Sequence, residues 1–176
     1  MIALIKKTKY RVPFAVVALV ILSSLWTTCS NSPMKSDAEN SGSSNSGVQP
    51  IFADDYLETF VEVRDCRFSS SHPGMVRVLV NEIGADAYLN KANPLPVGTI
   101  VVKEIFDGTA CDDYSDLGKW AVMRKEAAGF DSSHGNWSWQ ELLSDRSVLT
   151  DSKMNCIGCH RRDECASRDY MCTVQE

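Results

Sequence analysis

Beyond residue 50, the chain consists of short segments in which apolar positions recur with the period of a strand or of a helix. Strand-like composition, rich in β-branched and apolar residues, marks four segments: 75–80, 99–106, 120–126 and 136–143. Helical spacing or composition marks three others: 53–61, 85–91 and 156–170. This pattern predicts an α+β fold, mainly an antiparallel β-sheet with a few short helices, in a single domain.

The residues before this domain have a different composition and are predicted to lie outside the fold. Residues 1–28 begin with basic side chains and continue into an apolar stretch that is too short for a comfortable membrane span. We interpret them as a signal peptide that exports the protein. Residues 29–50 are rich in Ser, Asn and Gly, which predicts a flexible linker, and residues 51–176 then form one compact domain.

The apolar stretch ends at Cys29, in a context that resembles a bacterial lipoprotein signal. In such signals the cysteine becomes the lipidated first residue of the mature protein. Trp26 stands where leucine is usual, and ordinary secretion or a retained N-terminal anchor are the alternatives. We therefore expect the protein on the periplasmic side of the bacterial cell envelope. There the lipid on Cys29 would anchor it to a membrane, with the outer membrane as one option.

The charge of the chain excludes one class of partner. The sequence has 18 Lys and Arg residues against 23 Asp and Glu residues, a formal net charge of -5. Residues 1–28 hold four basic side chains and no acidic one, so their removal changes the formal charge from -5 to -9. Such an acidic protein lacks the electrostatic footprint of nucleic-acid binding, and we expect no nucleic-acid partner.

Cys156, Cys159 and His160 form the motif Cys-x-x-Cys-His, which in an exported protein is typical of covalent haem attachment. Two thiols at this spacing match the two vinyl groups of haem, and each adds across one vinyl group to form a thioether. His160 is then held under the iron as its axial ligand. The motif predicts one haem c as the cofactor.

Two other uses of these cysteines remain open from the sequence. Together with Cys165 and Cys172, they could form a zinc knuckle, although zinc sites of that kind belong mainly to reducing compartments. Plain disulfide chemistry is the other alternative for cysteines in an exported protein. Export therefore favours haem over zinc.

The motif lies near the end of the chain, with strands before it and only 16 residues after it. The common small c-type cytochromes are instead all-helical, with the motif near the N-terminus. The strand region and the motif together resemble the cytochrome P-460 family and its relative, the beta type of cytochrome c prime. The resemblance covers nearly all of residues 56–174. Its pieces occur in this order: 76–81, 96–104, 129–137, 156–160 and 169–170.

The resemblance implies an antiparallel sheet domain, often a homodimer, that holds one covalently bound haem with an open sixth coordination position. The name-giving members of the family oxidise hydroxylamine, and their relatives bind small gases. In the enzymes, a lysine of a Gly-Thr-x-x-x-Lys-Glu strand is also cross-linked to the haem ring. The matching residue in this sequence is Lys103.

The alternation of side chains along residues 99–106 is compatible with this role. On an extended strand, Lys103 lies on one face and Glu104 on the other, and both faces are otherwise largely apolar. Burying either charge without a partner is costly. A lysine aimed at the edge of the haem would resolve this cost, and an edge strand whose lysine reaches solvent is the alternative.

The resemblance also reveals one difference from the enzymes, which place a glutamate above the iron as a proton acceptor. The matching position is Ala121, which shares a strand face with Met123, so we expect an apolar distal pocket. Glu104 or Glu126 could substitute for the missing carboxylate in a different register. We therefore expect a protein that binds a small gas or nitrogen-oxide ligand or carries single electrons, with hydroxylamine oxidation as the alternative.

Further side chains are candidates for the sixth iron ligand: Met75, Met123, Met154, Met171, His72 and His134. Most of them are expected to be packing or surface residues, and Met123 is the best candidate if a side chain binds the iron. Neither the natural ligand nor the redox partner protein can be identified from the sequence.

Four cysteines remain outside the haem motif and the lipoprotein signal, and an even number in an exported domain predicts two disulfides. Of the three pairings, we favour Cys66 with Cys111 and Cys165 with Cys172. The second disulfide would close the C-terminal segment directly after the haem.

Overall fold

A computed structural model describes residues 47–150 and 154–172. The predicted signal peptide, Cys29 and most of the predicted linker lie outside these residues. In the described part of the chain, no helix is long and apolar enough to cross a membrane.

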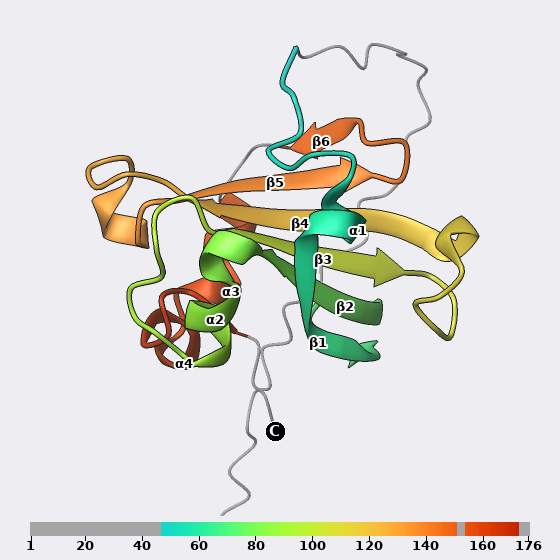
Figure 1. Ribbon diagram of the computed structural model, residues 1–176, viewed down its shortest axis with the longest axis horizontal. Helices are drawn as coiled ribbons and strands as arrows, with labels where there is room; N and C mark the ends of the chain where they lie inside the picture. The colour runs from blue at the N-terminus through green and yellow to red at the C-terminus, as the bar shows by residue number, and fades with distance from the viewer. Residues whose placement is uncertain (1–46, 151–153, 173–176) are drawn as a thin grey trace, which may run out of the picture.

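The core of the domain is one six-stranded sheet in which every neighbouring pair of strands is antiparallel. The spatial order of the strands is their order in the sequence (Figure 1). Their bounds are β1 Phe60–Ser69, β2 Gly74–Asn81, β3 Ile100–Phe106, β4 Leu117–Lys125, β5 Trp137–Leu143 and β6 Val148–Thr150. The predicted fold class, a mainly antiparallel sheet with a few short helices, is therefore confirmed.

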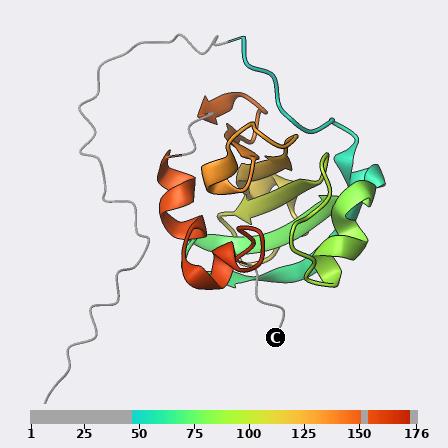
Figure 2. The same ribbon diagram turned by 90° about the vertical axis from the view of Figure 1, so that its left-hand side faces the viewer.

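Within residues 47–150 and 154–172, four short α-helices accompany the sheet: α1 Tyr56–Thr59, α2 Glu82–Leu89, α3 Met154–His160 and α4 Asp163–Ala166. Two turns of 3-10 helix lie in the connections, at Tyr114–Asp116 and Ser132–His134. Figures 1 and 2 show α2, α3 and α4 together at one side of the sheet. This grouping brings the C-terminal haem motif next to the middle strands.

Two predictions of secondary structure at the ends of the domain were wrong. Residues 53–61 were predicted as a helix, but α1 ends at Thr59 and β1 begins at Phe60, which pairs with Asn81 of β2. Cross-strand pairing overrides the weak helical spacing of so short a segment. The charged sequence of β1 and the two register shifts along it hide the strand pattern. The short strand β6 was also missed.

The sheet buries a different apolar cluster on each of its faces, and adjacent residues of β3 mark the two faces. Directly paired residues of antiparallel strands point to the same face, so Val78, Lys103 and Ala121 share one face, which we call the Lys103 face. Glu104 and its partners Arg77 and Trp120 share the opposite one, the Glu104 face. The alternation predicted for this strand is therefore confirmed.

The Lys103 face carries the larger cluster, which includes residues of α2 and α3. Its buried members are Val63, Val76, Val78, Val80, Ala85, Tyr88, Leu95, Val101, Ile105, Met123, Trp137, Trp139, Ile157 and Met171. The Glu104 face is covered by α1 and the segment before it. Its buried members are Phe52, Tyr56, Leu79, Val102, Phe106, Cys111, Leu117, Trp120, Val122 and Leu142. The haem motif thus lies on the Lys103 face, since Ile157 is part of that cluster.

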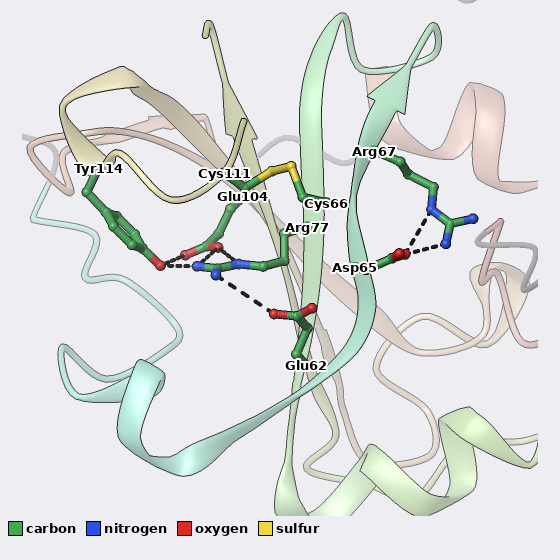
Figure 3. Close-up of a disulfide and its surroundings, with 8 residues drawn as sticks. All are labelled: Glu62, Asp65, Cys66, Arg67, Arg77, Glu104, Cys111 and Tyr114. Atoms are coloured by element: carbon green, nitrogen blue, oxygen red, sulfur yellow. Dashed lines mark hydrogen bonds and ion pairs between the residues drawn. A yellow bond between two sulfur atoms is a disulfide. The ribbon is translucent and has the colours of Figure 1, made fainter. Parts of the chain in front are cut away.

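On the Glu104 face, the carboxylate of Glu104 is fully buried and fully bonded (Figure 3). It accepts hydrogen bonds from the Tyr56 hydroxyl, from the Tyr114 hydroxyl at 2.9 Å and from Arg77 Nε at 2.6 Å. Trp120 Nε1 in turn donates to the Tyr56 hydroxyl at 3.1 Å. Burial and the neighbouring carboxylate both raise the pKa of Tyr56, so this hydroxyl remains a donor.

The same face holds the disulfide between Cys66 of β1 and Cys111 of the β3–β4 connection (Figure 3). Their Cα atoms are 5.7 Å apart, and the bond joins segments separated by 45 residues. The second disulfide, Cys165–Cys172, spans 7 residues after the haem motif. Both pairings are those favoured from the sequence.

Candidate functional site

Helix α3 carries the haem motif and presents it to the Lys103 face of the sheet. Ile157 is buried in the core cluster, and Cys156 packs against the same cluster while staying partly exposed. Cys156 and His160 are four residues apart, so they lie on neighbouring turns of the same side of the helix. Cys156 is a free thiol in the structure, as covalent attachment to a vinyl group requires.

The ring of His160 is oriented by a hydrogen bond that leaves one nitrogen for a metal. Nδ1 donates to the backbone carbonyl of Tyr170 at 2.7 Å, which fixes the proton on Nδ1 and the lone pair on Nε2. Burial, followed by the charge of Lys103, lowers the pKa of His160 to about 4. At neutral pH the side chain is therefore a neutral imidazole, the form that can bind a metal. The indole of Trp139 packs edge-on against it, with ring centroids 4.9 Å apart.

A buried ion pair holds the carbonyl that accepts this hydrogen bond. Asp169, which is 5% exposed, binds Lys125 Nζ at 2.6 Å and also accepts from the backbone N–H of Leu95 at 2.8 Å. Asp169 and Tyr170 both have left-handed backbone conformations, with φ of 53° and 70°. Such a turn persists only where its surroundings fix it. The ion pair of β4 with the C-terminal segment thus sets the direction of the Tyr170 carbonyl and, through it, the orientation of His160.

That segment was predicted to be helical as far as residue 170, but α4 ends at Ala166. The remainder is a turn, because the side chain of Asp169 bonds to Leu95 and Lys125 across the domain. Asn93 strengthens the same contact by donating to the backbone carbonyl of Ser167 at 2.8 Å. Sequence reasoning singled out Asp169 and Tyr170 only as part of a resemblance and missed Lys125 altogether. An isolated lysine in a strand gives no signal of a partner 44 residues away.

Lys103 lies in the middle of the sheet, opposite Ala121 on β4. Its side chain is largely buried, and within the described residues it makes no ion pair and no hydrogen bond. Burial, followed by the positive charge of Arg64, lowers the pKa of Lys103 to about 8, and Cys156 acts in the opposite sense. The structure therefore brings Lys103 close to the haem motif, as the resemblance implied, without a counter-ion among the described residues.

The distal candidates Ala121 and Met123 lie on the same face, two residues apart, as predicted. Neither of the two glutamates considered as substitutes does. Glu104 points to the opposite face, and Glu126 bonds to Arg124 Nε at 2.7 Å and Ser138 Oγ at 2.6 Å, both of which belong to the Glu104 face. The register of the sheet therefore excludes both Glu104 and Glu126 as replacements for the distal glutamate.

A different carboxylate, Glu141, occupies the Lys103 face. It lies directly opposite Ala121, is 27% exposed and forms an ion pair with Lys119 at 2.5 Å. Burial, followed by the charge of Glu141, raises the pKa of the Cys156 thiol, which places this carboxylate near the haem motif. Alternation along β5 puts Glu141 on the same face as Trp137 and Trp139, and the register of the sheet places it beside Ala121.

The candidates for the sixth ligand are scattered over the domain. Met75 packs against the cluster of the Glu104 face, and His134 contacts Asp131 at 3.0 Å, so neither is close to His160. Met123 and Met171 are buried in the core of the Lys103 face, and the side chain of Met154 lies outside the described residues. His72 is the exception, because its ring lies 6.5 Å from that of His160, measured between centroids.

The residues of this patch fit a haem. Polar groups of the Lys103 face are buried without protein partners: within the described residues, Arg64 Nε and Trp139 Nε1 find no hydrogen-bond acceptor. Haem carries two propionate groups, and Arg64 and Lys103 are cations of this face that form no ion pair within the described residues. The free thiol of Cys156, a neutral imidazole and these cations are groups that a haem can use, whereas Cys159 is disulfide-bonded in this structure.

The same patch does not fit a zinc knuckle. Cys165 and Cys172 are consumed by a disulfide, which removes two of the four ligands of that alternative. In the part of the chain that the structure describes, no group of three or more His, Cys, Asp or Glu side chains is placed to hold a metal ion. The zinc interpretation of the cysteines is therefore set aside.

Comparison with known proteins agrees with this site. A search of curated proteins gives no match. The family model described as cytochrome P460 matches residues 53–173, which is most of the chain and includes the whole sheet and the haem motif. This family is one of c-type haem cytochromes and implies a haem cofactor. The matched length, the sheet and the Cys-x-x-Cys-His motif together show that the chain belongs to the cytochrome P460 family.

Proposed function

We propose that this chain is an exported haem protein with one haem c, bound covalently through Cys156 and Cys159 and ligated by His160. It binds a small gas or nitrogen-oxide ligand or carries single electrons. The observation that supports this most strongly is the state of His160: it is neutral at neutral pH, and its Nδ1 is tied to the Tyr170 carbonyl. This hydrogen bond leaves Nε2 as the nitrogen with a lone pair for the iron.

Attachment would use both cysteines as thiols, so a thiol reductant would first have to reduce the disulfide in which Cys159 takes part in this structure. The sulfur of each cysteine bonds to one carbon of a vinyl group, and the thiol hydrogen goes to the other carbon. The protein contributes a free, partly exposed thiol at Cys156 and a helix that holds the attachment residues near His160. Bound there, haem supplies reversible one-electron chemistry and binding of diatomic ligands at iron.

The wall opposite the haem motif favours binding or electron transfer over proton-coupled oxidation. Ala121 has no ionisable group, and Met123 is 7% exposed and packed in the core. Oxidation of a hydrogen-bearing substrate requires a base within hydrogen-bond reach. The state of the iron position opposite His160 then distinguishes the two uses, since an open position binds ligands and a filled one favours electron transfer.

Hydroxylamine oxidation is the second candidate, and two side chains favour it. Lys103 is a largely buried amine without a partner among the described residues, and Glu141 places a carboxylate beside Ala121. Glu141 is engaged with Lys119, so it would have to exchange this partner before it could accept a substrate proton. Steady-state turnover of hydroxylamine with an artificial electron acceptor tests this candidate, and a rate no better than that of free haem would eliminate it.

The cellular setting belongs to the same proposal and comes from residues outside the described part of the chain. An export signal at 1–28, a lipid on Cys29 and a linker to residue 50 would hold the domain on the periplasmic side of a membrane. A redox partner protein would approach it there. A homodimer is a further expectation that sedimentation of the purified protein tests.

The haem assignment is tested by making the full chain in a host that matures c-type cytochromes. We expect a haem that stays attached after denaturation and a pyridine haemochrome spectrum typical of two thioether links. The double variant Cys156→Ala, Cys159→Ala should lose it. The matched control is Cys66→Ala, Cys111→Ala, which removes two cysteines from the opposite face and should retain the haem. Covalent haem at wild-type level in the first variant would show that the motif has been misinterpreted.

A further inference from the structure

Arg64 of β1 is a cation on the Lys103 face that no carboxylate of its own strand binds. It is directly paired with Val78 of β2, and Val78 is paired with Lys103, so the three side chains point to one face of the sheet. The neighbouring carboxylate, Asp65, is 69% exposed and accepts a hydrogen bond from Arg67 Nε at 3.0 Å (Figure 3). Asp65 is thus engaged by a different arginine, and Arg64 forms no ion pair within the described residues.

The guanidinium group of Arg64 is also partly buried. Its Nε atom is inaccessible to solvent and has no hydrogen-bond partner within the described residues. Burial, followed by the charge of Arg67, lowers the pKa of Arg64, and the opposing effects of Tyr88 and Asp65 do not reverse this. A buried donor without an acceptor costs free energy, and a charged donor costs more than a neutral one. A carboxylate from outside the chain would supply the missing acceptor.

A row of paired residues crosses the sheet from this arginine to the strands near the haem motif. From β1 to β5 the row consists of Arg64, Val78, Lys103, Ala121 and Glu141, whose side chains all point to the Lys103 face. Because neighbouring strands are about 4.8 Å apart, the backbone of Arg64 lies about 10 Å from that of Lys103 and about 14 Å from that of Ala121 along the row. Arg64 is therefore at one end of the row, and the strands β3 to β5 are at the other.

Cys156, a residue of the haem motif, lies over the strands β3 to β5. The charges that act on its thiol are those of Glu141, Lys103 and Lys119, which belong to β5, β3 and β4, and no described residue of β1 is among them. Lys103, by contrast, is affected by Arg64 from β1 and by Cys156 from α3. Lys103 therefore lies between the attachment residue and Arg64.

The covalent structure of haem matches this arrangement. Its vinyl groups and its propionates are on opposite edges of the porphyrin, so a haem attached at Cys156 carries its two carboxylates on the edge remote from the thioethers. We propose that Arg64 binds a haem propionate and thereby directs the macrocycle across the sheet from α3 to β1. This inference rests on the proposed covalent haem and assigns its orientation. An arginine suits this role, because its planar guanidinium can bind a carboxylate through two parallel hydrogen bonds.

The test compares variants of the full chain matured with haem. Resonance Raman spectra report the bending of the propionates, and we expect the wild-type band of a hydrogen-bonded propionate to shift in Arg64→Gln. The reduction potential of this variant should be lower, because the loss of a nearby positive charge stabilises the ferric form. Arg64→Lys should restore most of the potential and part of the band shift. The matched control is Arg67→Ala, which removes a cation of the same strand that already has a protein partner, and it should retain both wild-type values.

A second measurement separates cofactor binding from a purely structural role of Arg64. Arg64→Met should lower the melting temperature of the haem-loaded chain, because the propionate loses its partner. In the haem-free background Cys156→Ala, Cys159→Ala, the same change should raise the melting temperature, because it removes a buried donor that has no acceptor. A role confined to packing would change the melting temperature in the same direction in both backgrounds, and this result would contradict the inference.

The spectra and potentials can overturn the inference as well. Identical propionate bands and potentials in the wild type and Arg64→Gln would show that the two groups are not in contact. Equal falls in potential in Arg64→Gln and Arg67→Ala would indicate only a long-range effect of charge. A wild-type band typical of a propionate in water would exclude the contact without any variant, so the test holds even if Arg64→Gln fails to fold. Absence of covalent haem from the wild type would instead disprove the proposed function itself.

Discussion

Lys103 and Glu104 are neighbours in the chain and lie on opposite faces of the same strand, yet their surroundings differ completely. Glu104 is 0% exposed and accepts hydrogen bonds from two tyrosines and an arginine (Figure 3). Lys103 is largely buried and has no hydrogen bond or ion pair among the described residues. On the Glu104 face, the buried charge has its hydrogen-bond and ion-pair partners. On the Lys103 face, charged and hydrogen-bonding groups lack partners among the described residues.

This difference indicates which face serves stability and which serves function. A buried charge costs free energy unless the protein supplies its partners, and the Glu104 face supplies them all. On the Lys103 face, Arg64 Nε and Trp139 Nε1 are buried without hydrogen-bond partners within the described residues. A ligand bound at the Cys-x-x-Cys-His motif would supply partners for these unpaired polar groups.

The largest effect on stability is expected from removing the carboxylate of Glu104. Glu104→Ala leaves Arg77 as a partly buried cation without its main partner and should destabilise the protein by about 3–5 kcal/mol. Chemical denaturation followed by fluorescence measures this. The matched control is Glu141→Ala on the Lys103 face, which removes a partly exposed pair with Lys119 and should cost less than about 1 kcal/mol. Equal losses in the two variants would contradict the comparison.

A second prediction concerns the ion pair that supports His160 on the Lys103 face. Asp169→Asn removes the charge that holds Lys125, at a cost of about 3 kcal/mol, and frees the turn that carries the Tyr170 carbonyl. The hydrogen bond to His160 Nδ1 should weaken, which makes the imidazole a poorer donor to iron and raises the reduction potential. Spectroelectrochemistry of the haem-loaded variant measures the shift. A loss of stability with an unchanged potential would reduce this pair to a purely structural role.

A third prediction is a gain in stability, whereas the first is a loss. In the haem-free double variant Cys156→Ala, Cys159→Ala, the further change Lys103→Met removes a largely buried amine that has no partner among the described residues. We expect it to stabilise the haem-free protein by about 1 kcal/mol, because an apolar side chain of similar length replaces an uncompensated charge. Thermal unfolding measures this change. Destabilisation would mean that Lys103 is better accommodated by the protein alone than its surroundings indicate.

The smallest effect is expected from pH on the Glu104 face. Burial, followed by the charge and hydrogen bond of Glu104, raises the pKa of Tyr114 from 10.0 to about 12. A raised pKa in the folded state gives stability that is present below pH 10 and is lost as the pH rises towards 12. The melting temperature should therefore fall over this interval, and less steeply in Tyr114→Phe. Tyrosinate absorbance near 295 nm that develops with an ordinary pKa for every tyrosine would contradict this.

The sequence was a good guide wherever the information is local. Four of the six strands, the helix α2 and the alternation of Lys103 and Glu104 follow from the period of apolar residues along a few consecutive positions. Both disulfide pairings were favoured correctly. The strands β1 and β6 were missed because one carries many charges and two register shifts and the other has only three residues.

The sequence by itself determined the family, the mainly antiparallel fold and the haem-attachment motif. Each of these follows from short segments of consecutive residues and from the order of those segments along the chain. Tertiary structure alone decided which distant side chains meet. Sheet register placed Glu141 opposite Ala121 and excluded Glu104 and Glu126, the Lys125–Asp169 pair fixed the support of His160, and a hairpin turn brought His72 to the motif. The physical reason is that cross-strand register and buried charge pairs depend on contacts between residues that are far apart in the sequence. The local period of apolar residues does not predict such contacts.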